Sequence, residues 1–277
     1  MTQGTHARRR TAPGAATALV LIAAATAAAQ PPDVATIVSR MKQAVEPAQS
    51  SLRRMTLTVT QEGSTSKVVL GQARGKLADR NRILTVVLAP SDLQGTAYLV
   101  EEEAASDDTR QWVYVPAIGR VRTVISPEAF SAFLNSDFTY SDLGFTPLRS
   151  TYSLQGEDST QDVHTYRIEA VPAQRWYYTR IVTTVAADSF LPIERQFYDP
   201  ANQLWKVERF QGVSTINGVP TVLTLSMDDV QAKSRTTITV TDLKYGARIP
   251  EALLQSQGLP QARKSPLWTS LKAPVGR

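Results

Sequence analysis

The sequence predicts a mainly β protein built on one large antiparallel sheet. Roughly eleven apolar or alternating runs of strand length follow one helical segment. Turn signals such as Glu62-Gly63 and Asn217-Gly218 separate neighbouring runs at hairpin spacing. Links this short join antiparallel neighbours, because a parallel pair needs a long crossover. A sheet of this size is expected to curl strongly, since curling avoids long exposed edges.

The expected elements begin with a helix that starts after Asp33, a good N-cap residue, and ends before Pro47. Its apolar residues share one face: Val34, Ile37, Val38, Met41 and Val45. The expected strands are 55–59, 67–70, 83–88, 97–100, 111–115, 163–171, 176–185, 193–198, 204–210, 221–226 and 236–243. Several of them, including 83–88, are apolar on both faces, so each face of the sheet needs a cover.

A second helix is expected at residues 126–134, with Ser126 as N-cap and Pro127 in the first turn. It leads directly into an aromatic stretch, FLNSDFTYSDLGF, at residues 133–145. Two interpretations stay open for this region. It is either a flap laid against the sheet or a plain crossover packed on the core.

The first 29 residues have the pattern of an export signal that is removed from the mature protein. Three arginines at 8–10 precede the apolar run 15–25, and Ala27-Ala28-Ala29 provides the small residues of a cleavage site. A membrane anchor needs about 20 apolar residues, more than this run has. The sequence contains no cysteine, which excludes disulfides and a lipid-bearing cysteine. We expect a soluble exported protein, and the sequence leaves both the general and the twin-arginine export routes open.

The charge of the chain gives no sign of a nucleic-acid partner. The net charge is +5, and the three arginines of the first 29 residues supply three of these charges. A nucleic-acid binder is expected to keep a clustered basic excess on its folded domain. The remaining basic clusters are expected to form a solvated sheet face; they contain Arg53, Arg54, Arg74, Lys76, Arg80 and Arg82.

Few residues suit catalysis or metal binding. His164 is the single histidine after residue 29, and neither a G-x-S-x-G nor an H-E-x-x-H pattern occurs. The acidic run 101–108 lacks the ordered spacing of a calcium loop and is expected to be solvated. Asp137 and Asp142 remain as a candidate carboxylate pair for glycoside hydrolysis, although short acids at such positions commonly fix turns instead. No metal or cofactor is implied.

Residues 136–143, SDFTYSDL, resemble the SDF-[ST]-Y-x-D-[LM] signature of the outer-membrane lipoprotein-sorting protein family, relatives of the periplasmic carriers LolA and LolB. The resemblance extends over residues 33–254. Further agreement lies at 90–96, 112–116, 120–122, 191–193, 198–199 and 241–245. The chain departs from the pattern at Leu134-Asn135, where the family often has Met-Gly.

The resemblance implies an incomplete β-barrel with helices over its mouth, enclosing an apolar cavity that holds acyl chains. It divides the chain into the signal 1–29, a half-barrel domain 30–254 and a C-terminal tail 255–277. Residues expected to form the cavity and lid are Trp112, Tyr114, Phe130, Phe133, Phe138, Tyr140, Leu143 and Phe145. Residues expected to position the lid are Ser136, Asp137 and Asp142. The resemblance implies no catalytic residue, and alternation alone does not say which strand face lines the cavity.

Three functional classes therefore remain. The first is a periplasmic carrier that binds the acyl chains of lipoproteins or other lipids for transfer between membranes. The second is a non-carrying accessory subunit of an RND-type exporter, because family members are often encoded beside such inner-membrane transporters. The third is a hydrolase. The mature protein is expected to have no membrane-spanning segment and no nucleic-acid partner.

Overall fold

The computed structural model describes residues 1, 2, 4, 32–102, 109–125, 128, 130–143, 149–160, 163–173 and 177–271. Two compact units divide the chain at Pro31 and Pro32. The named helices and strands all belong to the second unit, Pro32–Arg277.

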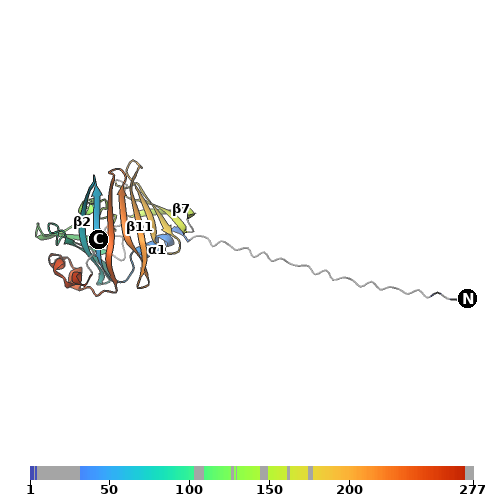
Figure 1. Ribbon diagram of the computed structural model, residues 1–277, viewed down its shortest axis with the longest axis horizontal. Coiled ribbons are helices and arrows are strands. Elements are labelled where there is room, and N and C mark those ends of the chain that lie inside the picture. Colours follow the sequence, from blue (N-terminus) through green and yellow to red (C-terminus); the bar gives the residue numbers. More distant parts are fainter. Residues whose placement is uncertain are drawn as a thin grey trace. The chain divides into compact units, whose positions relative to one another are not determined.

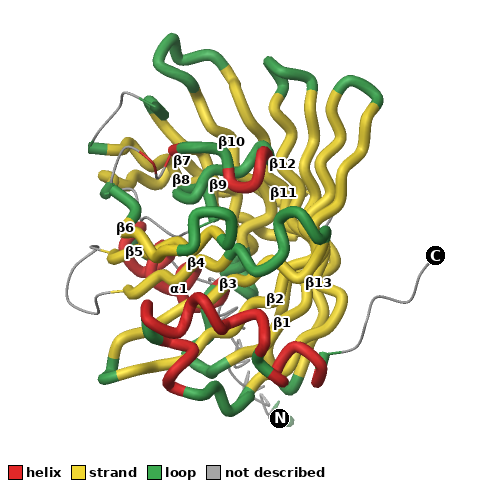
Figure 2. The backbone as a smooth tube through the Cα atoms, turned by 90° about the vertical axis from the view of Figure 1, so that its left-hand side faces the viewer, coloured by secondary structure: helices red, strands yellow, loops and turns green. Residues whose placement is uncertain are grey.

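The second unit is mainly β, as predicted, and its described residues form one sheet of 13 antiparallel strands (Figure 1). The strands are β1 (Ser51–Gln61), β2 (Ser64–Leu77), β3 (Arg80–Ala89), β4 (Ala97–Glu102), β5 (Thr109–Val115), β6 (Arg120–Thr123), β7 (Ser150–Thr160), β8 (Val163–Pro172), β9 (Arg180–Ala186), β10 (Pro192–Tyr198), β11 (Leu204–Ile216), β12 (Val219–Asp229) and β13 (Ser234–Tyr245). Figure 2 shows the curl of the sheet: β3–β6 run across the view, whereas β11–β13 run up it.

The strand order explains why this sheet is an incomplete barrel. The order is β6-β5-β4-β3-β2-β1-β13-β12-β11-β10-β9-β8-β7, so β1 pairs with both β2 and β13 at the centre. Strands β6 and β7 follow each other in the sequence but lie at opposite edges, and their described residues do not pair. The chain between them therefore has to pass from one edge of the sheet to the other.

Each strand expected from the sequence has a counterpart, and the sequence interpretation missed β6 and β7. These two are the edge strands. Strand β6 has one apolar residue among four, and the described side chains of β7 are mostly exposed. An edge strand packs against less of the core than a central strand, so it lacks the apolar run by which a strand is recognised.

Alternation divides the sheet into an inner and an outer face, each with its own apolar cluster. Inner-face residues of β1–β4 include Leu57, Leu70 and Tyr98, and they pack with Phe133 and Phe138 from the segment between the two edges. Outer-face residues of the same strands pack under the C-terminal turns; they include Leu52, Ala73, Leu84, Val86 and Leu99.

Three 3-10 helices at the C-terminus cover the outer face: η3 (Glu251–Leu254), η4 (Ser256–Lys264) and η5 (Pro266–Ser270). The ring of Trp268 lies on Gly71, where a Cβ atom would be 2.5 Å from the indole. Residues 256–271, which the sequence interpretation assigned to a tail, thus form part of the packed domain. Pro260 and Pro266 keep this segment out of α-helix, and the apolar residues consequently lack a 3.6-residue period.

The predicted N-terminal helix is confirmed as α1, Val34–Val45. Asp33 caps it by accepting a hydrogen bond of 2.7 Å from the backbone N–H of Thr36. Its buried face, Ile37, Val38 and Met41, packs on apolar residues of β8 and β9.

The second predicted helix, 126–134, can be compared with the structure only in part. Residues 126, 127 and 129 lie outside the described residues, and those that follow end in a short 3-10 helix, η2 (Phe133–Asn135). Leu134 and Asn135 both adopt left-handed backbone conformations, with φ of 51° and 57°. Asparagine tolerates this region better than most residues, which explains how it can stand where the family pattern has glycine.

Candidate functional site

The segment that crosses the open side of the sheet, residues 130–143, is here called the lid segment. Its middle folds back on itself: Ala132 and Thr139 form an antiparallel bridge, and the Phe133 N–H donates to the Phe138 carbonyl at 2.8 Å. This turn directs both phenylalanine rings into the inner-face cluster, where Phe133 is 1% exposed and Phe138 is fully buried. The lid segment therefore fills part of the inner face as well as covering it.

Aromatic rings from the sheet hold the lid segment on both sides. The Phe133 ring contacts Tyr98 of β4 at 5.1 Å and Tyr140 at 5.4 Å between centroids. The Phe130 ring contacts Tyr177, just before β9, at 4.9 Å. Burial raises the pKa of the Tyr98 hydroxyl above its usual value, so this residue is neutral in the cluster.

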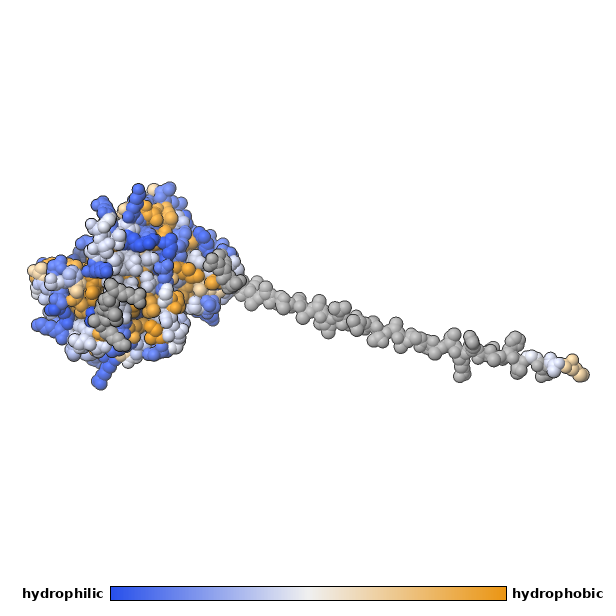
Figure 3. Space-filling model, in the orientation of Figure 1, coloured by the Kyte–Doolittle hydropathy of each residue, from blue (hydrophilic) through white to orange (hydrophobic). Residues whose placement is uncertain are grey.

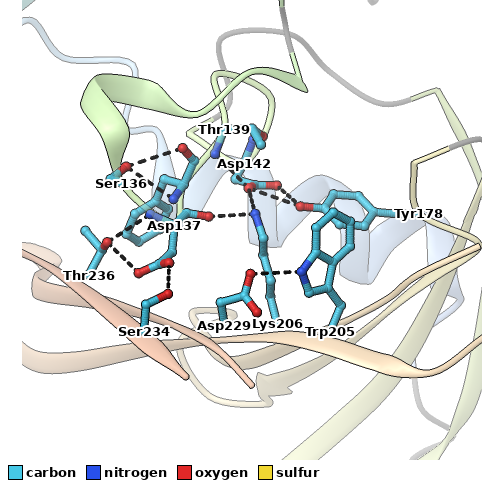
Figure 4. A network of polar contacts seen from close by, with 11 residues as sticks. Ser136, Asp137, Thr139, Asp142, Tyr178, Trp205, Lys206, Asp229, Ser234 and Thr236 are labelled. Carbon is cyan, nitrogen blue, oxygen red and sulfur yellow. Dashed lines mark hydrogen bonds and ion pairs between the residues drawn. The ribbon is translucent and has the colours of Figure 1, made fainter. Parts of the chain in front are cut away.

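Asp137 attaches the lid segment to β13 (Figure 4). Its carboxylate accepts hydrogen bonds from the hydroxyls of Ser234 and Thr236, the latter at 2.7 Å. The backbone N–H of Asp137 in turn donates to the Thr236 hydroxyl at 2.9 Å. The Ser136 hydroxyl bonds to the backbone of Phe138 and stiffens the turn.

Asp142 is the second attachment point, and its side chain is only 1% exposed. Its carboxylate accepts a hydrogen bond of 2.9 Å from the Thr139 N–H and bonds of 2.9 and 3.1 Å from the Tyr178 hydroxyl. The Asp142 N–H donates to the Thr139 hydroxyl at 3.0 Å, which closes a local turn. This carboxylate therefore fixes the lid backbone and joins it to the chain before β9.

Lys206 of β11 connects the two attachment points. Its ammonium group donates to the Asp137 carbonyl at 2.6 Å and lies 3.5 Å from an oxygen of Asp142. Only 5% of its side chain is exposed, so this is a buried ion pair. Glu208, two residues further along the same face, contacts Arg195 at 3.3 Å. Burial raises the pKa of Glu208 to about 7, although Arg195 opposes the shift.

Beside the lid segment, two adjoining cavities open between α1 and the inner face. One has a volume of about 140 Å³ and is bounded by the lid residues Phe133 and Leu143; the other, of about 90 Å³, lies toward β12. They share the wall residues Val45, Arg53, Met55, Leu225 and Ile238. Most of the lining side chains are apolar, so the cavities suit a hydrocarbon better than a polar solute.

One end of these cavities is charged. Arg53 lines both, and Arg74 and Glu46 line the one beside the lid segment. Arg74 is buried and contacts Glu46 at 3.1 Å and Glu102 at 3.4 Å. The expectation of a solvated basic face is therefore wrong for Arg74. Its position on β2 directs the side chain to the inner face of the sheet, which the lid segment covers.

The structure brings together most of the residues expected to form a site. Phe130, Phe133, Phe138, Tyr140 and Leu143 lie on or against the inner-face cluster, and Phe145 lies outside the described residues. Trp112 and Tyr114 instead pack on the outer face beneath the C-terminal turns. The prediction that Trp112 and Tyr114 line the cavity is therefore wrong. Val113, between them, is the residue of β5 whose side chain faces inward.

The sequence interpretation missed the partners of the lid segment on the sheet, notably Tyr98, Tyr178, Lys206, Ser234 and Thr236. Lys206 carried a weak signal, since Lys206 and Glu208 place two charges on one face of a predicted strand, between Leu204 and Phe210. The other partners could not be found without the strand register, because they are separated from the lid by tens of residues in the sequence.

The arrangement offers little for catalysis. Both carboxylates of the candidate pair accept hydrogen bonds from the protein's own hydroxyl and N–H groups. In the described part of the chain, no three or more His, Cys, Asp or Glu side chains gather as a metal site. None of the described helices is both long and apolar enough to cross a membrane.

Similar solved structures define the class of fold. A DUF1329 family protein from Desulfovibrio piger is 26% identical, with a TM-score of 0.74 over 83% of this chain and 100% of that one. A putative outer membrane lipoprotein-sorting protein domain from Vibrio parahaemolyticus is 21% identical, with a TM-score of 0.73 over 81% and 97%. A LolA superfamily protein from Nitrosomonas europaea is 16% identical, with a TM-score of 0.64 over 81% and 98%.

These neighbours show that the chain has a LolA-like fold, as the sequence resemblance predicted. A family model described as "Uncharacterized protein" matches residues 79–261, more than half of the chain, and the protein belongs to that family. A search of the curated proteins gives no match.

Proposed function

We propose that this protein is a periplasmic carrier that holds the acyl chains of lipidated proteins or other lipids between the inner face of its sheet and the lid segment, for transfer between membranes. The observation that carries the proposal is the pair of apolar cavities bounded by α1, β1, β12, β13 and the lid residues Phe133 and Leu143. The LolA-like fold supports the same function.

The physical reason for such a carrier is the cost of apolar surface in water. An acyl chain gains about 0.8 kcal/mol for each CH₂ group removed from water. Surface already covered by the protein itself cannot supply that gain, so a carrier needs apolar walls that a ligand can reach. Leu225, Ile238 and Met55 provide such walls.

The lid segment has to move for a long chain to bind. Each cavity is smaller than the ~300 Å³ at which small-molecule sites begin, and the Phe133 and Phe138 rings occupy the adjacent space. Displacing these rings frees apolar area on Tyr98 and its neighbours, which the acyl chain then covers. In this proposal Phe130, Phe133, Phe138, Tyr140 and Leu143 contact the ligand or give way to it.

The attachment of the lid segment suits reversible opening. Its anchors are hydrogen bonds from Ser234, Thr236 and Tyr178 to two carboxylates, together with the contacts of Lys206 to Asp137 and Asp142. When the lid opens, water can replace each of these bonds, and the net cost per bond to a charged group is about 1.5–3 kcal/mol. A ligand that binds only the open form shifts the population toward it.

Export supports the location. The first 29 residues have the pattern of a cleaved signal, and the proposed mature protein is soluble in the periplasm. N-terminal sequencing of the protein from a Gram-negative periplasm is expected to begin at or near Gln30. An intact Met1 in a membrane fraction would contradict this part of the proposal.

Binding of a fluorescent fatty-acid probe to the delipidated protein tests the function, with a series of fatty acids of increasing length as competitors. Affinity is expected to rise with each added CH₂ until the chain is fully covered. Leu225→Phe fills the wall shared by both cavities and is expected to weaken binding of the longest chains most. Leu204→Phe, at an exposed position of β11, is the matched control.

Circular dichroism on the same variants separates loss of binding from loss of folding. If the folded wild type neither retains lipid when purified nor binds any fatty acid, the carrier function is wrong. The exporter-accessory function then takes its place.

A further inference from the structure

Arg53 stands out among the charged residues of the inner face. It lies on β1 two positions before Met55, so its side chain points to the same side of the sheet. It is in the wall of both cavities, where they meet. Its neighbour Arg54 points the other way and donates a hydrogen bond of 3.3 Å to the Trp268 carbonyl on the outer face.

Within the described part of the chain, the Arg53 guanidinium makes no hydrogen bond or ion pair. Its Nε atom is fully buried and has no partner. Burial lowers the pKa of the guanidinium, Arg74 lowers it further, and Tyr245 and Glu46 oppose the shift. Arginine remains charged in proteins, so an unpaired positive charge faces the cavities.

The charges around Arg53 explain why it has no partner. Arg74, from the neighbouring strand β2, contacts Glu46, the carboxylate that acts on Arg53, at 3.1 Å, and also contacts Glu102 at 3.4 Å. The Tyr245 hydroxyl is engaged with the Thr221 hydroxyl at 2.9 Å. The Arg53 guanidinium therefore lies beside oxygen atoms of Glu46 and Tyr245 that already have other partners, Arg74 and Thr221.

We propose that Arg53 binds the anionic head of the lipid, a carboxylate or phosphate, while the acyl chain extends along Met55, Leu225 and Ile238 toward the lid segment. This inference rests on the proposed carrier function and names the class of its ligand, an anionic amphiphile. A guanidinium pairs with either oxyanion through two parallel N–H···O bonds. The charged end and the apolar walls of the joined cavities match the two ends of such a molecule.

The test compares three ligands that share one acyl chain: oleate, oleyl phosphate and oleyl alcohol. Each competes at pH 7.5 against N-phenyl-1-naphthylamine, an uncharged apolar fluorophore. The wild type is expected to bind at least one anion about tenfold or more tightly than the alcohol, the range expected for a charge-assisted hydrogen bond. The tighter anion identifies the head group.

Arg53→Gln is expected to bring the anions and the alcohol within about threefold of each other, with affinity for the alcohol unchanged. Arg54→Gln removes the same charge from the adjacent outer-face position and is expected to keep the wild-type preference. Circular dichroism and thermal melting establish that both variants are folded.

The outcomes separate this inference from the proposed function. If the wild type binds oleyl alcohol as tightly as the anions, or if Arg53→Gln keeps the preference, the head-group site is wrong and the carrier stands. If none of the three ligands displaces the fluorophore, the carrier function fails together with this inference.

Discussion

Asp142→Asn is the substitution for which the structure gives the most definite expectation. The change keeps the size of the side chain but removes its negative charge. Lys206 is then a buried cation that keeps only two contacts among the described residues, the Asp137 carbonyl 2.6 Å away and the Trp205 ring, whose centroid is 5.1 Å away. The asparagine has one acceptor oxygen where the carboxylate accepts from both Thr139 and Tyr178.

The magnitude follows from the distance and the burial. Two unit charges 3.5 Å apart interact by about 5 kcal/mol at an effective dielectric constant of about 20. Measured costs of removing one partner from a buried ion pair are about 3–5 kcal/mol. We therefore expect Asp142→Asn to lower the free energy of unfolding by about 3 kcal/mol or more.

Urea unfolding monitored by fluorescence measures this loss in the free energy of unfolding. The two-state comparison is valid if the free energy of unfolding falls with urea concentration at the same slope in the variant and the wild type. Glu128→Gln is the control, because Glu128 pairs with Arg122 and their side chains are 35% and 49% exposed. A pair at such a surface position is worth less than about 1 kcal/mol.

The double variant Asp142→Asn/Lys206→Met tests whether the pair is responsible. Removing both charges leaves no buried cation, so its cost is expected to be smaller than the sum of the single costs by at least about 2 kcal/mol. The reasoning is refuted if Asp142→Asn costs less than about 1 kcal/mol, or if the two single costs simply add.

Three further predictions concern other parts of the domain. Gly71→Ala is expected to cost about 1–3 kcal/mol, because its Cβ would lie 2.5 Å from the Trp268 ring; tryptophan fluorescence and thermal melting check it, and an unchanged melting temperature would contradict the packing. Glu208 has a folded-state pKa of about 7, above its ordinary 4.5, so its ionisation opposes folding. The wild type is expected to lose stability relative to Glu208→Gln as pH rises from about 4.5 to 7, by a few kcal/mol at most; parallel pH curves of unfolding would contradict the raised pKa. Arg53→Met is expected to stabilise the ligand-free protein by about 1–3 kcal/mol, since it removes a buried unpaired donor; a lower melting temperature would show that Arg53 has a partner.

The sequence was sufficient for the parts of the fold that depend on local pattern. Helix α1 has a capping residue and one apolar face, and the central strands have apolar runs bounded by turns. The edge strands β6 and β7 lack such runs, because they face little of the core. The 3-10 helices at the C-terminus were missed for the related reason that Pro260 and Pro266 remove helical periodicity.

The candidate site shows a similar division. The motif at 136–143 located the lid segment, because its aromatic and acidic residues are close together in the sequence. Its partners lie on β4, β11 and β13, and only the strand register brings them under it. Trp112 and Tyr114 were placed on the wrong face because alternation gives two sets of side chains without saying which set faces inward.

Exposed apolar residues give no separate indication of a binding surface. Those on the described surface include Ile118, Ile193 and Val213, which lie on different strands or turns. On the face seen in Figure 3, apolar residues form small patches among hydrophilic ones. Single exposed apolar residues are normal on soluble proteins, so the enclosed inner face remains the stronger candidate.

A reversible lock on the lid segment tests most directly whether acyl chains bind beneath it. Asp137 and Ser234 already meet through their side chains, and the natural sequence has no cysteine to interfere. In Asp137→Cys/Ser234→Cys, a disulfide ties the lid segment to β13, and reduction releases it. Each single-cysteine variant controls for the loss of the hydrogen bonds.

The measurement is the binding of a fluorescent fatty acid to the same double-cysteine protein before and after reduction. We predict that the oxidised protein binds at least about tenfold more weakly than the reduced one, because long chains fit only when the lid segment moves. Mass spectrometry confirms the disulfide in the sample used. Equal binding by the oxidised and reduced forms would show that the acyl chain does not enter under the lid segment.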